Sequence, residues 1–208
     1  MASYPKTNLT LDQYFEIEAT SELRWEYWDG QIVCMSGASR NHVLICANVQ
    51  AALVVALQGS ECRTFGPEAI DTPALLPYRY PDVSVVCGKP EWRSLYFRDL
   101  LVNPVLIVEV ESPSSKAVDH GPKMEAYKAL TSLGHYLIIA QDRHSVTHWA
   151  RLETGDWDYQ VLTSIDAWVR LTSIDCRLQM SDIYRDVEFT ASQPTLRDPT
   201  SVDEYQVT

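Results

Sequence analysis

The sequence predicts an α/β fold in which helices pack on a mixed β-sheet. From residue 39 onward the candidate elements follow the order α-β-β-β-α-β, and helices interleaved with strands are typical of a sheet covered by helices. A helix and a hairpin precede this stretch, and a β-rich extension follows it. The chain has 208 residues, a length that suits one domain with a sizeable core.

Before the core, the sequence predicts a short helix and then a tight hairpin. Thr10 and Gln13 have the spacing of a capping box, which places the start of the helix next to Thr10. Within residues 25–35, two strand-like runs flank Asp29-Gly30, a dipeptide that tolerates the positive φ angles of a type I′ turn.

The core elements follow from caps and apolar runs. Ser39 is placed to cap a longer helix that reaches about Leu57. Pro122 fits the first turn of a second helix, which we expect to run to about Leu133 and to stop at Gly134. Between these helices we expect three successive strands, at residues 62–70, 80–87 and 105–111.

After the second helix the sequence predicts a strand at 135–140 and two more strands around 146–151 and 157–163. We expect residues 1–8 to form an N-terminal tail and residues 9–187 to form one domain. The polar, proline-interrupted segment 188–208 predicts a flexible C-terminal tail.

Composition indicates a cytoplasmic protein without a membrane partner. The first residues lack the apolar core of a signal peptide, and the apolar runs are far too short to span a bilayer. Lys and Arg total 17 against 28 Asp and Glu, which gives a net charge of −11. This balance argues mildly against a nucleic-acid partner, because such proteins usually carry a basic face.

The cysteines are odd in number and show no C-x-x-C pair. We therefore expect reduced core residues and neither a disulfide framework nor a zinc site. They are Cys34, Cys46, Cys62, Cys87 and Cys176.

Charged residues interrupt two runs that otherwise have the pattern of buried strands. Asp82 lies in the run 80–86, and Glu109 and Glu111 close the run 104–111. Burying a carboxylate costs several kcal/mol or more unless a cation or hydrogen bonds compensate, so such residues usually belong to a site.

These positions suggest one metal site. Residues two apart on a strand share a face, which puts Glu109 and Glu111 on one side. If the two strands are neighbours, Asp82 and Glu109 converge, and Lys123 approaches them from the first turn of the following helix. Several carboxylates with one lysine suggest a divalent metal and hydrolysis.

Three segments of the chain are Tyr80-Pro81-Asp82-Val83-Ser84-Val85-Val86, Val108-Glu109-Val110-x-Ser112-Pro113-Ser114-Ser115 and Asp119-x-Gly121-x-Lys123. Together they resemble the Uma-two family of restriction-endonuclease-like proteins. The N-terminal helix, the Trp28-Asp29-Gly30 hairpin and Ile138-x-Ala140-Gln141-Asp142 also fit, so the resemblance covers about residues 9–187. That family belongs to the PD-(D/E)xK nuclease superfamily, and the resemblance implies a restriction-endonuclease-like core.

The resemblance implies Mg²⁺- or Mn²⁺-dependent hydrolysis of DNA. Asp82 and Glu109 would hold the metal, with Glu111 as a further ligand. Lys123 would position the nucleophile or stabilise the phosphorane, as a lysine that has moved from the strand to the helix. His42 matches a position where the family often carries histidine. DNA is then the expected partner, and a homodimer is left open.

Two departures from the family pattern keep an alternative open. Position 111 is usually leucine in the family, and the arginines that relatives place near residues 68–71 are absent here. A catalytically degenerate binding module on the same fold is therefore the second hypothesis, and the lack of a basic stripe favours it. A glycosidase, which also needs two carboxylates, is a third hypothesis. The lysine argues against it, because glycoside cleavage has no phosphate charge to balance.

Overall fold

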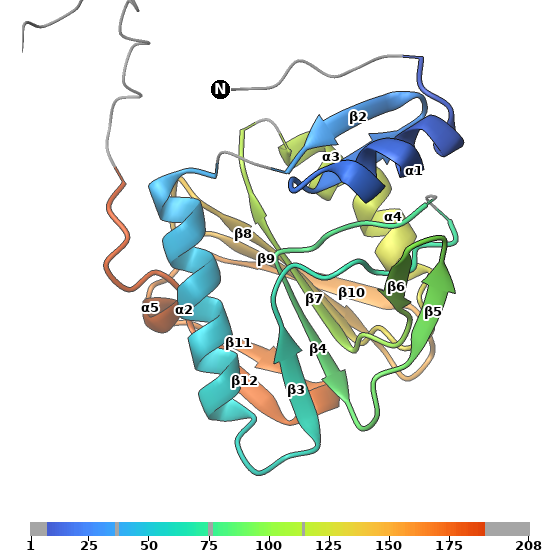
Figure 1. Ribbon diagram of the computed structural model, residues 1–208. Coiled ribbons are helices and arrows are strands. Elements are labelled where there is room, and N and C mark those ends of the chain that lie inside the picture. The colour runs from blue at the N-terminus through green and yellow to red at the C-terminus, as the bar shows by residue number, and fades with distance from the viewer. Residues whose placement is uncertain (1–7, 36–37, 75–76, 114, 190–208) are drawn as a thin grey trace, which may run out of the picture.

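The computed structural model describes residues 8–35, 38–74, 77–113 and 115–189 (Figure 1). The expected tails at 1–8 and 188–208 therefore lie almost wholly outside the described residues. The elements in chain order are α1 (Leu11–Thr20), β1 (Trp25–Trp28), β2 (Gln31–Cys34), α2 (Arg40–Ala56), β3 (Cys62–Phe65), β4 (Val83–Cys87), β5 (Trp92–Leu95), β6 (Arg98–Leu101), β7 (Leu106–Glu111), α3 (Lys116–Asp119), α4 (Pro122–Lys128), β8 (His135–Ala140), β9 (Val146–Arg151), β10 (Trp157–Leu162), β11 (Trp168–Leu171), η1 (Thr172–Ile174), β12 (Cys176–Gln179) and α5 (Met180–Ile183).

A six-stranded mixed sheet forms the centre, in the order β10-β9-β8-β7-β4-β3. β7 and β8 are parallel and the other neighbours are antiparallel. α2 packs on one face through Ile45, Val49 and Leu53, and this core also receives β11, β12 and α5. α4 packs on the opposite face, where Tyr127 lies against Tyr136 of β8. The expected α/β class with helices on a mixed sheet is confirmed.

Several local predictions are confirmed. Thr10 and Gln13 form the capping box of α1, and the Ser39 hydroxyl accepts from the backbone N–H of His42 at the start of α2. Asp29 and Gly30, between β1 and β2, both have positive φ angles of 43° and 84°. These local signals are reliable because they depend only on residues close in sequence.

Two element boundaries differ from the prediction. β3 ends at Phe65 instead of continuing to residue 70, because Pro67 lacks the N–H that a continuing strand needs. α4 ends at Lys128 and not near Leu133. The Arg151 guanidinium donates to the carbonyl oxygens of Lys128, Leu130 and Leu133, and so satisfies groups that a longer helix would bond internally.

The β5–β6 hairpin was not predicted. Its strands carry polar and charged residues without clear alternation, and its turn places Tyr96 at a φ of 54°. A tyrosine in this region gives none of the Gly or Asn signals that mark tight turns.

The prediction that all cysteines are reduced is wrong for one pair. Cys62 and Cys87 lie directly opposite each other in the β3–β4 ladder and form a disulfide. The two residues are 25 positions apart, so only the strand register brings them together. Cys46 and Cys176 carry free thiols.

In the described part of the chain, no helix has both the length and the apolarity needed to cross a bilayer. The cytoplasmic location remains a prediction from the sequence, as do the domain boundaries.

Two buried histidines connect the sheet to the C-terminal extension. His135 of β8 and His148 of β9 lie with Nδ1 and Nε2 2.9 Å apart. The backbone N–H of Ser173 donates to His135 Nε2, so the proton of His135 is on Nδ1 and points at His148. Burial, reinforced by the charge of His148, lowers the pKa of His135 to about 4, and burial, partly offset by Asp158, lowers the pKa of His148 to about 4.

We expect acid to destabilise the protein through this pair. Free histidines titrate near pH 6.5, whereas the folded pair titrates near 4, so the unfolded state binds more protons between these values. The free energy of unfolding should therefore fall by about 2 kcal/mol or more between pH 6.5 and 5. Urea unfolding followed by tryptophan fluorescence measures this loss.

The variant His148→Gln should show a flatter pH dependence over this range. His144→Gln, which changes an exposed histidine, is the matched control and should keep the slope of the wild type. If His148→Gln and the wild type lose stability equally between pH 6.5 and 5, the pair does not cause the loss.

Candidate active site

A cleft of about 330 Å³ opens at the end of the sheet where β7 finishes and α2 begins. In Figure 1 this region lies below β2, between the first turn of α2 and α3. Four of the five predicted site residues line the cleft: Asp82, Glu109, Lys123 and His42. Glu111 does not line it.

Strand pairing places Asp82 beside Glu109. β4 and β7 are antiparallel neighbours with Val83 opposite Val108, so the next position along the register sets Asp82 against Glu109. The expected neighbour relation of the two strands is confirmed. Asp82 accepts a hydrogen bond of 2.7 Å from the backbone N–H of Val110, which fixes its carboxylate at the end of β7.

Asp82 does not lie within the strand that the sequence predicts over residues 80–87. β4 begins only at Val83, after Pro81, so Asp82 lies just before the strand and not within it. Its side chain contacts α2, with its Oδ2 3.3 Å from His42 Nε2. Burial disfavours the charged imidazole, but the hydrogen bond and charge of Asp82 outweigh this and raise the pKa of His42.

Lys123 lies among three carboxylates from separate parts of the chain. Its Nζ is 3.2 Å from Glu109 Oε1, 3.3 Å from Glu26 Oε1 and 3.7 Å from Asp119 Oδ1. None of these four side chains is more than 5% exposed. Burial alone lowers the pKa of Lys123, but the carboxylates together outweigh it and raise this pKa, so the lysine is charged.

The carboxylates outnumber the cations in this region. Burial raises the pKa of Glu109 well above its usual value; Lys123 opposes this shift, and the other acids reinforce it. The Tyr127 hydroxyl also donates to Glu109 Oε1 at 2.9 Å. Burial likewise raises the pKa of Asp119, whose buried Oδ1 has no hydrogen-bond partner in the described structure.

A charge count shows the size of the imbalance. Four carboxylates, those of Asp82, Glu109, Asp119 and Glu26, face Lys123 and the buried Arg79, which interacts electrostatically with two of them. The carboxylates therefore outnumber these two cations by two, and the raised pKa values of Glu109 and Asp119 mean that protons or a metal ion can take up this excess. All the carboxylate donors are oxygens, the ligand type that Mg²⁺ and Mn²⁺ prefer, so the residues fit such an ion.

Glu111 is held outside the cleft by a histidine and an arginine. His120 Nε2 lies 2.7 Å from one of its oxygens and Arg143 Nη2 lies 2.9 Å from the other. Glu111 is buried, so it is not a solvated strand end. The structure therefore does not bring Glu111 together with Asp82 and Glu109.

Sequence reasoning missed three residues of this region. Glu26 lies on β1, 97 positions before Lys123, and carried no local signal. Asp119 was part of the quoted Asp119-x-Gly121-x-Lys123 motif, and its i,i+4 spacing to Lys123 could have identified it. Cys46 lies one helical turn after His42, and its Sγ is 3.6 Å from His42 Nδ1.

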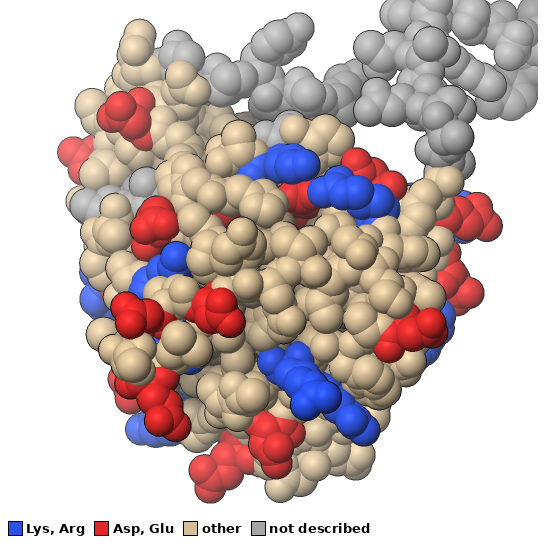
Figure 2. Space-filling model, turned by 180° about the vertical axis from the view of Figure 1, so that it is seen from behind, with Lys and Arg blue, Asp and Glu red and all other residues tan. Residues whose placement is uncertain are grey.

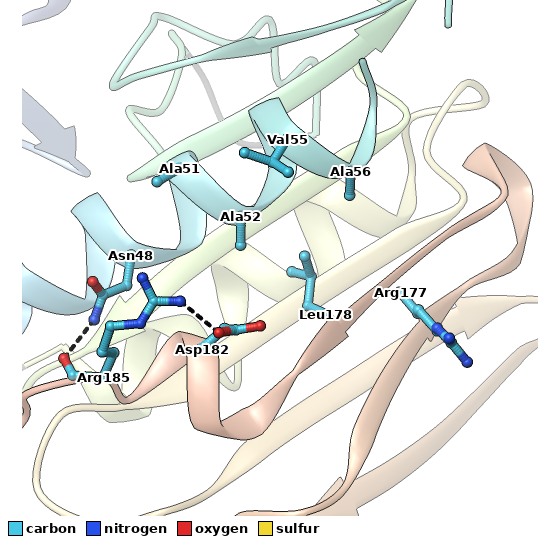
Figure 3. Close-up of a pocket in the computed structure, with 9 residues that line it drawn as sticks. All are labelled: Asn48, Ala51, Ala52, Val55, Ala56, Arg177, Leu178, Asp182 and Arg185. Carbon is cyan, nitrogen blue, oxygen red and sulfur yellow. Dashed lines mark hydrogen bonds and ion pairs between the residues drawn. The ribbon is translucent and has the colours of Figure 1, made fainter. Parts of the chain in front are cut away.

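A second pocket, of about 270 Å³, lies between α2, β12 and α5 (Figure 3). Small apolar side chains of α2 form one wall. Two of its charged groups contact each other, because Arg185 pairs with Asp182 at 2.5 Å, and the Arg185 carbonyl accepts from Asn48. The pocket has no cluster of carboxylates, so the first cleft is the candidate active site.

The family model described as "Putative restriction endonuclease" matches residues 11–189. The chain belongs to the Uma2 family. This is the family that the sequence motifs resemble. The uncharacterized proteins slr1290 and sll1609 of Synechocystis sp. are 31% and 27% identical over 90% and 72% of this chain, and over 96% and 84% of their own lengths.

A solved structure supports the fold of this Uma2 member. It is described as a putative nuclease belonging to DUF820 from Anabaena variabilis, with a TM-score of 0.67 and 18% identity. The match covers 85% of this chain and 97% of that one. At this identity the similarity demonstrates a nuclease-type fold.

We expect Lys123→Ala to destabilise this Uma2 protein by about 3 kcal/mol or more at pH 7, because removing one partner of a buried ion cluster leaves uncompensated charge. The loss should be smaller at pH 5, where the carboxylates with raised pKa values bind protons. Urea unfolding at the two pH values measures both effects. Lys116→Ala, at an exposed position on α3, should change stability by less than about 0.5 kcal/mol. Equal effects of the two substitutions would show that the cluster does not stabilise the fold.

Proposed function

We propose that this Uma2-family protein is a divalent-metal-dependent endonuclease that hydrolyses DNA phosphodiester bonds. The observation that carries the proposal is the excess of carboxylate around Lys123 in an accessible cleft. Ionising buried carboxylates without enough cations is costly, and a divalent cation would balance the two surplus carboxylates. The family description and the solved nuclease fold support a hydrolytic role on nucleic acid.

Asp82 and Glu109 are the proposed metal ligands, and Asp119 is a candidate third ligand through its buried Oδ1. When bound, the ion supplies positive charge to a phosphate and makes an attacking water more acidic. The chain's own groups hold the ligands in place: the Val110 N–H orients Asp82, and the Tyr127 hydroxyl orients Glu109. This fixed arrangement needs little reorganisation during the reaction.

Lys123 is the proposed electrostatic catalyst. Its ammonium group is at the cleft and carries a charge that its carboxylate neighbours maintain. In this position it can orient a water or stabilise the charge that develops on a pentavalent phosphate. His42 is a positioning residue, because it contacts the ligand Asp82.

The proposed substrate must reach the cleft against an acidic background. Figure 2 shows one face of the molecule, where acidic side chains are spread widely and basic ones form separate small groups. The sequence carries a net charge of −11. Local cations at the cleft would therefore have to provide the attraction for phosphate.

The second candidate is a binding module without turnover. It is favoured by the saturation of Lys123, which already contacts three carboxylates, and by the separated basic groups in Figure 2. Such a module would bind the metal and a nucleic acid but would leave phosphodiester bonds intact.

Mg²⁺ or Mn²⁺ should stabilise the wild type, by roughly 2.7 kcal/mol at a free concentration of 100 times the dissociation constant. Asp82→Asn and Glu109→Gln should lose most of the thermal shift and reduce plasmid cleavage by about 100-fold or more. Glu125→Gln, which changes an exposed carboxylate on α4, should keep the thermal shift and the plasmid cleavage of the wild type.

A thermal shift of the same size in the wild type and in Asp82→Asn would exclude Asp82 as a ligand. A metal-dependent shift that disappears in Asp82→Asn, combined with no cleavage by the wild type, would favour the binding module.

A further inference from the structure

One wall of the cleft carries a second set of metal-binding atoms. His42 and Cys46 are four residues apart on α2, so they lie on the same side of the helix. His42 lies between Cys46 and Asp82, with contacts of 3.6 Å to the sulfur and 3.3 Å to the carboxylate. One donor atom from each of the three residues lies within 4.8 Å of the other two.

The donor set differs in kind from the oxygen ligands across the cleft. Imidazole nitrogen, thiolate sulfur and carboxylate oxygen are together typical ligands of Zn²⁺, whereas Mg²⁺ prefers oxygen alone. Three protein ligands leave one tetrahedral position for water or another molecule. His42 and Asp82 line the cleft, so an ion can enter from it.

Cys46 is protonated before an ion binds. Burial, reinforced by the charges of Asp82 and Glu109, raises the pKa of its thiol above the usual range. Binding of the ion therefore replaces the thiol proton, which leaves to solvent.

We propose that His42, Cys46 and Asp82 form a site for Zn²⁺ or a similar thiophilic transition metal. Asp82 belongs to both this site and the Mg²⁺ site proposed above. Zinc bound here takes Asp82 as its own ligand and so antagonises Mg²⁺. This antagonism, unlike the zinc site itself, rests on the proposed function.

Co²⁺ is a suitable probe because a cobalt–thiolate bond produces a charge-transfer band in the near ultraviolet. The wild type, with the Cys62–Cys87 disulfide intact, should develop this band with one equivalent of Co²⁺ and lose it when Zn²⁺ is added. Cys46→Ser should lose the band, whereas Cys176→Ser, which changes a free thiol on β12, should retain it.

Two further variants keep the assignment falsifiable. His42→Gln leaves the thiol in place and should weaken Co²⁺ binding at least tenfold. Cys34→Ser tests a cysteine that lines the cleft and should leave the band intact. A band that survives in Cys46→Ser, or that disappears in Cys34→Ser, overturns the proposal.

The antagonism is measured in the same protein with buffered Zn²⁺. Zinc should remove the Mg²⁺-dependent thermal shift of the wild type, and Cys46→Ser should require at least tenfold more zinc for the same effect. The cleavage rate of each variant is divided by its own zinc-free rate. On this scale, zinc should inhibit the wild type at a lower concentration than Cys46→Ser. If the wild type shows no Mg²⁺ effect but forms the cobalt band, the proposed function fails while the zinc site stands. If zinc leaves the Mg²⁺ shift of the wild type unchanged, the shared role of Asp82 is wrong.

Discussion

The charge on Lys123 is the constraint around which the candidate site is arranged. A buried ammonium group is stable only with close carboxylates, and three of them come from β1, β7 and α3. These contacts attach the N-terminal hairpin and the α3–α4 segment to the end of the central sheet. The same carboxylates outnumber the lysine, so the arrangement that stabilises the cation also leaves an excess of carboxylates at the cleft.

The core of the fold could be predicted from the sequence because its signals are local. The caps at Thr10 and Ser39 and the turn at Asp29-Gly30 depend on neighbouring residues, and the apolar runs of β7 and β8 have strand length. Asp82 and Glu109 could be singled out because each carries charge in a run with the pattern of a buried strand, and Lys123 because the Asp119-x-Gly121-x-Lys123 segment resembles the family pattern. Their common location follows from one strand pairing that the order of elements already suggested.

The remaining features depend on contacts between distant segments. Glu26 reaches Lys123 only after the hairpin docks, and Cys62 meets Cys87 only through the β3–β4 register. Glu111 has the same strand environment as Glu109 in the sequence. The ion pair of Glu111 with Arg143, which lies in the turn after β8, holds Glu111 outside the cleft, whereas Glu109 contacts Lys123. No periodicity or spacing in the sequence encodes such partners.

The parallel pairing of β7 and β8 has a consequence for insertions and deletions. Parallel neighbours require a crossover, and here the crossover contains α3 and α4 and therefore carries Lys123. One extra residue at the start of α4 would rotate the lysine by roughly 100° about the helix axis, away from Glu109. The exposed turn at residues 153–156 joins antiparallel strands and carries no group of the cleft. Insertions or deletions in the β9–β10 turn therefore leave the candidate site intact, whereas those in the crossover disrupt it.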